Sequence, residues 1–121
     1  MKKKNDTQSF AHAISGVRYV FYHEKNFRIH VFCAGVVIFL GILFGLLLVE
    51  WLFILFAIGF VFVLECLNSA VELLIDVVVP RLQQKAGAAK DVMAGAVLCS
   101  AFTAGTIGLA VFLPYVVELF L

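Results

Sequence analysis

The order of apolar and polar positions divides the chain into one amphipathic segment and three long apolar segments. In the amphipathic segment, residues 7–27, apolar side chains recur at spacings of three and four, at Phe10, Ile14, Val17 and Phe21. This spacing places them on one face of a helix, for which Asp6 or Thr7 is the expected N-cap. We expect an amphipathic helix in the membrane interface, with a soluble helix docked on a partner as the alternative.

Three further segments, residues 31–49, 51–79 and 92–118, are apolar enough to cross a membrane. The first has 19 residues and no charge, which at about 1.5 Å per residue is enough to cross roughly 30 Å of hydrocarbon. Pro80 ends the second because it cannot continue helical hydrogen bonding, and the polar residues 81–90 predict a loop before the third. We therefore expect three transmembrane helices.

Several positions in these segments indicate packing or anchoring. Gly41 and Gly45 form a small-xxx-small pair that is typical of close helix packing. Glu50 and Trp51 predict a short connection at the membrane surface, where tryptophan is a common anchor. Pro114 lies near the end of the last segment, where a kink or an early stop costs little.

Composition agrees with a membrane protein. The 121 residues are 64% hydrophobic and 14% charged, whereas soluble domains have about 45–50% apolar and about 25% charged residues. This length allows one domain with at most three spans, and we expect an oligomer because so small a bundle has little interior. A net charge of +1 without a basic patch argues against nucleic-acid binding. Cys33, Cys66 and Cys99 are scattered through apolar segments and indicate small buried side chains rather than a disulfide or a metal site.

The basic residues predict how the chain crosses the cell membrane. All 9 Lys and Arg residues precede the first apolar segment or lie between the second and the third. By the positive-inside rule, the N-terminus and the second loop are cytoplasmic and the C-terminus lies outside. No signal-peptide pattern is present at the N-terminus, so insertion through the protein's own spans is expected.

A polar stripe interrupts the second apolar segment. Its members, Glu65, Asn68, Glu72 and Asp76, fall within about 80° of one another on a helix that turns about 100° per residue. An ionisable group at membrane depth costs about 2.5–3.5 kcal/mol even on lenient insertion scales, so such groups usually have partners and a function. The alternative is a stripe that only holds neighbouring helices together.

Depth in the membrane distinguishes these residues. Counted from the outer surface at about 1.5 Å per residue, Glu65 lies roughly 9 Å inside the cytoplasmic hydrocarbon edge, Glu72 lies at the edge and Asp76 lies beyond it. The segments Glu24–Arg28 and Lys90–Asp91 reach the same level from other helices. Carboxylate ligands of this kind suit Mg²⁺, and a lysine beside them suits phosphate oxygens.

At these residues the sequence resembles the small prokaryotic diacylglycerol kinase family, and it is most similar to the undecaprenol kinase branch. The matching motifs are Glu24-Lys25-Asn26-Phe27-Arg28-Ile29-His30, Glu65-x-x-Asn68-Ser69-Ala70-x-Glu72, and Ala88-Ala89-Lys90-Asp91 followed by Ala94-Gly95-Ala96-Val97. The likeness extends from about Phe10 to Pro114. The glutamate–asparagine block joined to a downstream Ala-Lys-Asp is specific.

The resemblance implies an all-α integral membrane protein, a homotrimeric helical bundle with an amphipathic surface helix and three transmembrane helices in each protomer. It implies MgATP-dependent phosphorylation of a lipid hydroxyl at the cytoplasmic interface, in a site shared between neighbouring subunits. It also implies residue roles: Glu65 as general base, Glu24 and Glu72 as Mg²⁺ ligands in the ATP site, Asn68 in support, Lys90, Asp91 and His12 as nucleotide contacts, and Arg18 and Trp51 toward the lipid.

The expected acceptor is undecaprenol, giving undecaprenyl phosphate for cell-envelope synthesis. Relatives that prefer diacylglycerol tend to carry an acidic residue at the position of His30. Diacylglycerol kinase activity, which makes phosphatidic acid, is the alternative. On the residues alone, His12 and His30 are typical of interface histidines. The sequence contains neither a Walker-type phosphate loop nor a kinase glycine-rich loop, so side chains and a metal would hold the nucleotide.

Two non-enzymatic functions remain open on the residues alone. A small channel or proton-coupled transport subunit would use intramembrane carboxylates as an ion path. It would carry charges through the full bilayer depth, and here the outer half of every span is uncharged. A purely structural assembly subunit would tolerate alanine at Glu24, Glu65 and Glu72 together.

Overall fold

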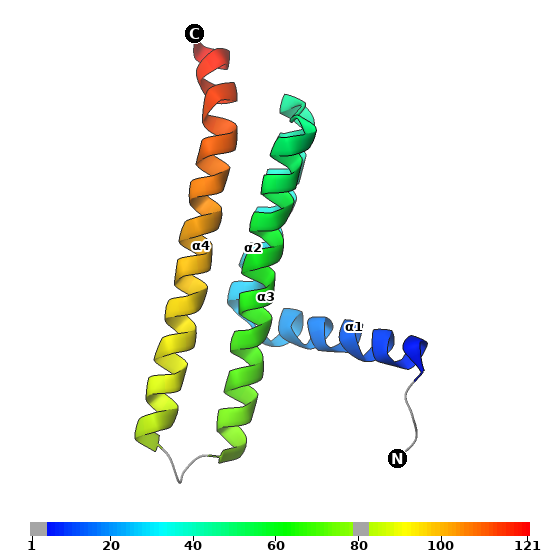
Figure 1. Ribbon diagram of the computed structural model, residues 1–121, viewed down its shortest axis with the longest axis vertical. Coiled ribbons are helices and arrows are strands. Elements are labelled where there is room, and N and C mark those ends of the chain that lie inside the picture. The colour runs from blue at the N-terminus through cyan, green and yellow to red at the C-terminus, as the bar shows by residue number, and fades with distance from the viewer. Residues whose placement is uncertain (1–4, 79–82) are drawn as a thin grey trace.

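The computed structural model describes residues 5–78 and 83–121, which fold into four α-helices (Figure 1). The helices are α1 (Asp6–His23), α2 (Lys25–Phe44), α3 (Leu48–Val78) and α4 (Gln83–Phe120). No strand occurs in this described part of the chain, so the expected all-α class is confirmed. The basic residues 2–4 and the expected helix end at Val79 and Pro80 lie outside the described residues.

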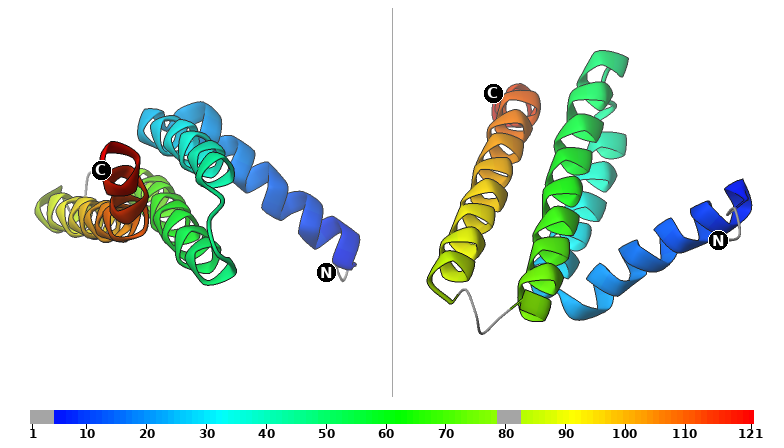
Figure 2. Two further views of the ribbon diagram at one scale, coloured as in Figure 1. Left: turned by 90° about the horizontal axis from the view of Figure 1, so that it is seen from above. Right: turned by 60° about the horizontal axis from the view of Figure 1, so that its bottom comes forward.

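The helices α2, α3 and α4 are each long and apolar enough to cross a membrane. They run side by side, while α1 projects away from them (Figure 1, Figure 2). Large apolar side chains are exposed along all three, for example Phe32, Leu55 and Phe102. Because a soluble protein rarely exposes so large an apolar surface, the chain is a multi-pass membrane protein, as expected.

The first helix is shorter than the expected one. It follows Asn5, whose side-chain Oδ1 accepts a hydrogen bond of 2.8 Å from a backbone N–H of the first turn. Residues 6–7, where the N-cap was expected, are already helical. The helix ends at His23 because Glu24 is extended, with φ −113° and ψ 110°. The single helix expected over residues 7–27 is therefore two helices joined by one extended residue.

The elbow between α1 and α2 is held by Arg28. Its Nη1 donates hydrogen bonds to the carbonyl oxygens of Phe21, at 2.9 Å, and Tyr22, at 3.0 Å. Carbonyls in the last turn of a helix lack partners within the helix, and a cation at that end also complements the helix dipole. Because these carbonyl oxygens have hydrogen-bond partners, the chain can turn at the single residue Glu24. The helix α2 therefore begins at Lys25 rather than at residue 31.

The two glycines near the end of α2, Gly41 and Gly45, have different functions. Gly45 follows Phe44 with φ 69° and ψ 55°, the left-handed conformation that glycine adopts after a helix, so α2 ends before the expected limit at residue 49. Gly41 packs against Trp51, because a Cβ at position 41 would lie 2.6 Å from Trp51 Cη2. Only Gly41 therefore serves the close packing that the pair predicts.

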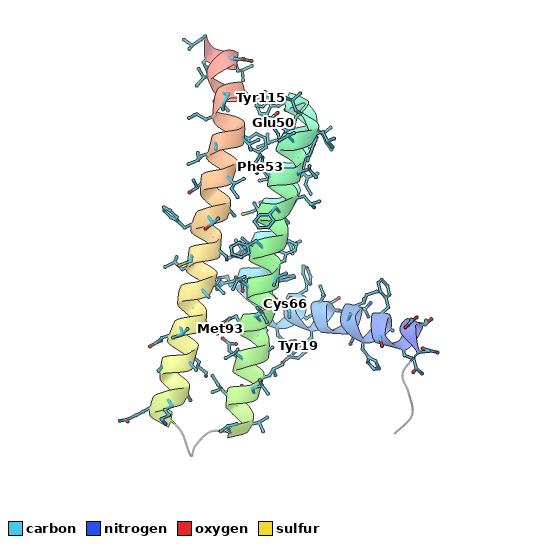
Figure 3. All side chains as sticks on the ribbon, viewed as in Figure 1. Tyr19, Glu50, Phe53, Cys66, Met93 and Tyr115 are labelled. Carbon is cyan, nitrogen blue, oxygen red and sulfur yellow. The ribbon has the colours of Figure 1, made fainter. Side chains whose placement is uncertain are left out.

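The first turn of α3 contains Glu50 and Trp51, which were expected in a connection. Glu50 Oε1 accepts a hydrogen bond of 2.9 Å from the Leu47 N–H and another from the Tyr115 hydroxyl of α4 (Figure 3). These bonds satisfy part of a helix N-terminus and join α3 to α4. Beside them, Trp51 and Tyr115 pack against the buried apolar cluster of Leu46, Ile54 and Val111.

The last helix is longer than expected at its start. The polar residues 81–90 predicted a loop, but from Gln83 onward they belong to α4. Alanine, glutamine and lysine are good helix formers, and only Gly87 opposes them. Pro114 lies inside α4, and the helix continues to Phe120. One long helix therefore replaces part of the expected loop together with the expected span over residues 92–118, and it packs mainly against α3.

Candidate active site

Glu65 lies on the buried face of α3. The buried residues of this helix are Ile54, Ala57, Val61, Glu65 and Ser69, at spacings of three and four. One face of α3 therefore points inward, with apolar side chains followed by polar ones. Glu65 is only 1% exposed, so its carboxyl group is withdrawn from both water and lipid.

His30 of α2 faces this carboxyl group. Its Nε2 lies 3.3 Å from Glu65 Oε1, which is within ion-pair distance when the imidazole is protonated. The two groups do not meet the geometry of a hydrogen bond, and Glu65 Oε1 has no hydrogen-bond partner among the described residues. His30 is therefore a site residue that the sequence did not identify, although its motif contains it.

Helical spacing is the signal that points to His30. The buried residues of α2 are Phe27, Ala34 and Gly41, and position 30 lies on the same face as Phe27 and Ala34. This spacing has meaning only if the helix includes residue 30. Because α2 was expected to begin at residue 31, His30 was assigned to the interface before the span.

The elbow brings Glu24 next to Glu72. The pKa of Glu24 is raised, first because its carboxyl group is partly buried and then because the Glu72 carboxylate lies beside it. Hydrogen bonding with Glu72 and the charge of Glu65 also raise this pKa, whereas the Ser69 hydroxyl lowers it. Ser69 Oγ itself makes no hydrogen bond of good geometry within the described chain. The carboxyl groups of Glu24, Glu65 and Glu72, from the elbow and α3, are therefore close enough for their charges to interact.

Lys90 pairs with Asp76 across α4 and α3. The Nζ–Oδ1 distance is 3.9 Å and both side chains are exposed, so the pair contributes about 0–1 kcal/mol to stability. Asp91 is exposed at the next position, and Asn68 is half-buried on α3. Lys90 thus contacts the polar stripe of α3 at Asp76, the member of the stripe farthest from Glu65.

Three other predicted residues are not buried with Glu65. His12 and Arg18 are exposed on α1, the helix that projects from the bundle (Figure 2). Trp51 lies at the opposite end of α3, about 21 Å from Glu65 along the helix at about 1.5 Å per residue. A single chain therefore does not gather the complete set of predicted residues into one site.

The carboxyl groups offer a partial ligand set for a cation. Among the described residues, no group of three or more His, Cys, Asp or Glu side chains is arranged to hold a metal ion. Glu24 and Glu72 form a pair, and Mg²⁺ is commonly bound by one or two carboxylates together with phosphate oxygens and water. A divalent cation would relieve the repulsion that helps to raise the pKa of Glu24. The pair therefore fits a cation that arrives with phosphate ligands.

An apolar groove of about 500 Å³ lies between α2, α3 and α4. Its α4 wall is formed largely by small residues, Ala101, Ala104, Gly105 and Gly108. His30 belongs to the lining of the groove, and Glu65 does not. The imidazole therefore stands between the groove and the buried carboxyl group.

Fold and site together define a class of protein. A multi-pass helical membrane protein holds carboxyl groups from an elbow and from a spanning helix in the half of the bundle from which α1 projects (Figure 1). Acidic groups are costly at membrane depth, so their convergence indicates chemistry at the boundary between lipid and water.

Comparison with known proteins agrees with this class. The model of the prokaryotic diacylglycerol kinase family matches residues 11–112. The undecaprenol kinase of Bacillus subtilis is 40% identical over 107 residues, which are 88% of this chain and 87% of that protein. The diacylglycerol kinase of Synechocystis sp. is 37% identical over 112 residues, which are 92% of this chain and 64% of that protein. No solved structure matches the chain.

The chain therefore belongs to the prokaryotic diacylglycerol kinase family, and it is an ATP-dependent lipid kinase of the membrane. Membership of this family favours the enzymatic function over the two functions that the residues alone left open, a channel or transport subunit and a structural subunit.

Proposed function

We propose that this protein transfers the γ-phosphate of ATP to the hydroxyl of undecaprenol and so produces undecaprenyl phosphate. The observation that carries the proposal is the 40% identity to an undecaprenol kinase over 87% of that relative's length. The grouping of Glu24, Glu65 and Glu72 supports phosphoryl transfer at the edge of the membrane, where an aqueous nucleotide can meet a lipid alcohol.

Glu65 is proposed as the general base. It would take the proton of the acceptor hydroxyl as that oxygen forms a bond to the γ-phosphorus. The bond from the γ-phosphorus to the bridging oxygen breaks, and ADP leaves with the electron pair. The 1% exposure of Glu65 supports this role, because a carboxylate shielded from water would activate a bound alcohol in preference to water.

Glu24 and Glu72 are proposed to hold Mg²⁺. Bound Mg²⁺ neutralises charge on the phosphate oxygens of the nucleotide. The two carboxylates would provide its protein ligands, and the one-residue elbow would keep Glu24 against α3 for this purpose.

Lys90 and Asp91 are proposed to contact the nucleotide, with His12 as a further contact and Asn68 in support. Among the described residues, Lys90 pairs with Asp76 at 3.9 Å in an exposed position, so a phosphate group could replace that partner at small cost.

Arg18 and Trp51 are proposed on the lipid side. Arg18 is exposed beside the apolar α1 residues Ala13, Ile14 and Val17, a combination suited to lipid headgroups and tails. Trp51 lies in the first turn of α3, where an indole suits a membrane–water boundary.

The protein is proposed to act as a homotrimer that places α1 in the membrane interface. Phe10, Ile14 and Val17 are exposed on α1, and large apolar side chains are exposed on every long helix. Lipid and neighbouring subunits would together cover these surfaces. The N-terminus would be cytoplasmic and the C-terminus extracytoplasmic, and neighbouring subunits would bring the separated nucleotide contacts to the carboxyl groups.

Purified protein should be assayed with MgATP and, side by side, undecaprenol and diacylglycerol in matched mixed micelles. Faster transfer of labelled phosphate to undecaprenol supports the proposal. Faster transfer to diacylglycerol favours the second candidate, for which the 37% identity to a diacylglycerol kinase is the observation. Phosphorylation of neither lipid would contradict both.

A further inference from the structure

Glu65 Oε1 is a buried acceptor that lacks a hydrogen bond among the described residues. A charged acceptor left unpaired in the interior is far less stable than one with a donor. His30 Nε2, at 3.3 Å, is placed to supply that donor. Because the second side-chain torsion of histidine is broad, a small rotation of the ring aligns Nε2–H with Oε1 without movement of the backbone.

Among the described residues, none of the carboxyl, hydroxyl and thiol groups around Glu65 donates a hydrogen bond to its Oε1. Glu24 and Glu72 are carboxyl groups whose charges repel that of Glu65. The Ser69 hydroxyl, one turn along α3, makes no hydrogen bond within the described chain, and the thiol of Cys66 is a weak donor. The imidazole of His30 is therefore the donor that the structure places beside Glu65 Oε1.

We propose that His30 is a positioning residue for the base: its Nε2–H donates to Glu65 Oε1 and turns the second carboxylate oxygen toward the acceptor hydroxyl. This inference rests on the proposed role of Glu65. His30 exchanges no proton with the substrate, and it decides which oxygen of the base faces the reaction. The imidazole is 26% exposed and lines the apolar groove, so it is suited to hold Glu65 from the groove side.

Two substitutions of His30 distinguish the effect of losing the hydrogen-bond donor from the effect of changing the shape of the side chain. His30→Leu removes the donor, and His30→Gln replaces it with an amide N–H. We expect kcat of His30→Leu to fall about 10- to 100-fold, with the KM for MgATP and for undecaprenol within about twofold of wild type. We expect kcat of His30→Gln to stay within about threefold of wild type. Cys33→Ala changes another residue of the groove lining on α2 and should retain the wild-type kcat.

A fully active His30→Leu variant would overturn the inference. Equal losses of kcat in the Leu and Gln variants, with equal losses of thermal stability, would also overturn it, because they indicate a structural role. If His30→Leu does not fold, a folded His30→Gln variant with kcat reduced more than about tenfold contradicts the inference, and a nearly normal kcat supports it.

Glu65→Gln should be measured in parallel. Full activity of that variant would contradict the general-base role and this inference together. An inactive Glu65→Gln beside a fully active His30→Leu would contradict this inference alone.

Discussion

The hydroxyl of Tyr115 donates a hydrogen bond to Glu50, 65 positions earlier in the chain (Figure 3). The same carboxylate oxygen accepts the Leu47 N–H at 2.9 Å. One side chain therefore caps the start of α3 and attaches α4 to it, at the end of α3 that is farther from Glu65. This contact stabilises the helix pair without taking part in the acidic site.

Replacement of Tyr115 by phenylalanine should destabilise the protein and leave its chemistry unchanged. A hydrogen bond to a charged group contributes about 1.5–3 kcal/mol, so the free energy of unfolding should fall by an amount of that order. Unfolding in mixed micelles with increasing denaturing detergent measures the change. Tyr22→Phe is the matched control because Tyr22 is exposed. A large loss of kcat with unchanged stability would contradict the prediction.

Substitution of Gly41 by alanine should disturb the packing between α2 and α3. The added methyl group would lie 2.6 Å from Trp51 Cη2 and 3.0 Å from Trp51 Cζ2, and overpacking of this kind costs about 1–3 kcal/mol. Thermal unfolding should occur at a lower temperature, and Trp51→Leu in the same chain should restore part of the loss. Gly35→Ala, where a Cβ meets nothing within 4 Å, should be neutral. Equal effects at positions 35 and 41 would refute the packing argument.

Glu65→Gln should abolish turnover while the protein remains folded. The amide has nearly the same shape but cannot act as a base, and loss of general-base catalysis lowers kcat by about 10²–10⁴-fold. Phosphate transfer to undecaprenol measures this effect, and size-exclusion chromatography checks that the fold is retained. Glu118→Gln, exposed near the end of α4, is the control. Wild-type kcat in Glu65→Gln would remove this residue from the reaction.

With a metal chelator present, stability should fall as pH rises above the ordinary pKa of Glu24. In the folded chain this pKa is raised above its ordinary value of 4.5. Between 4.5 and the raised value the folded state binds more protons than the unfolded state, so the free energy of unfolding decreases with rising pH. Thermal unfolding at several pH values across this window measures the slope of the free energy of unfolding against pH.

The Glu72→Gln variant tests the cause of that slope. Burial, the larger cause of the raised pKa, remains in this variant, but the repulsion by a neighbouring carboxylate is removed. The slope should therefore become smaller without vanishing. A slope that is unchanged in Glu72→Gln would mean that the two carboxyl groups do not interact.

Much of the fold was predictable because lipid imposes requirements on each span separately. Length and apolarity indicate α2, α3 and α4 without knowledge of their neighbours. Helix ends were less predictable, because they depend on single contacts. Arg28 caps α1 from the following helix, and Gly45 ends α2 by a left-handed turn. Helix propensity outweighed polarity in the segment after Gln83.

The candidate site was partly predictable for the same reason. Helical period and depth indicated that Glu65 and Glu72 share one face of α3, and the level of Glu24 indicated that it could join them. His30 was not identified, because its function depends on where α2 begins and on which face it turns to α3. The roles of these residues in catalysis, metal binding and nucleotide binding stay predictions.

The sequence by itself indicated an all-helical membrane protein with carboxyl groups at one membrane level, and its resemblance to a known family indicated a kinase. The physical reason is that each span must be long and apolar enough to cross the membrane, and each charge at membrane depth is costly. Both requirements act on single segments of the chain, so they are visible as local sequence patterns. Only the tertiary structure decided that His30 faces Glu65 and that Tyr115 reaches Glu50. These contacts join different helices, and their geometry depends on how the helices pack rather than on any local preference.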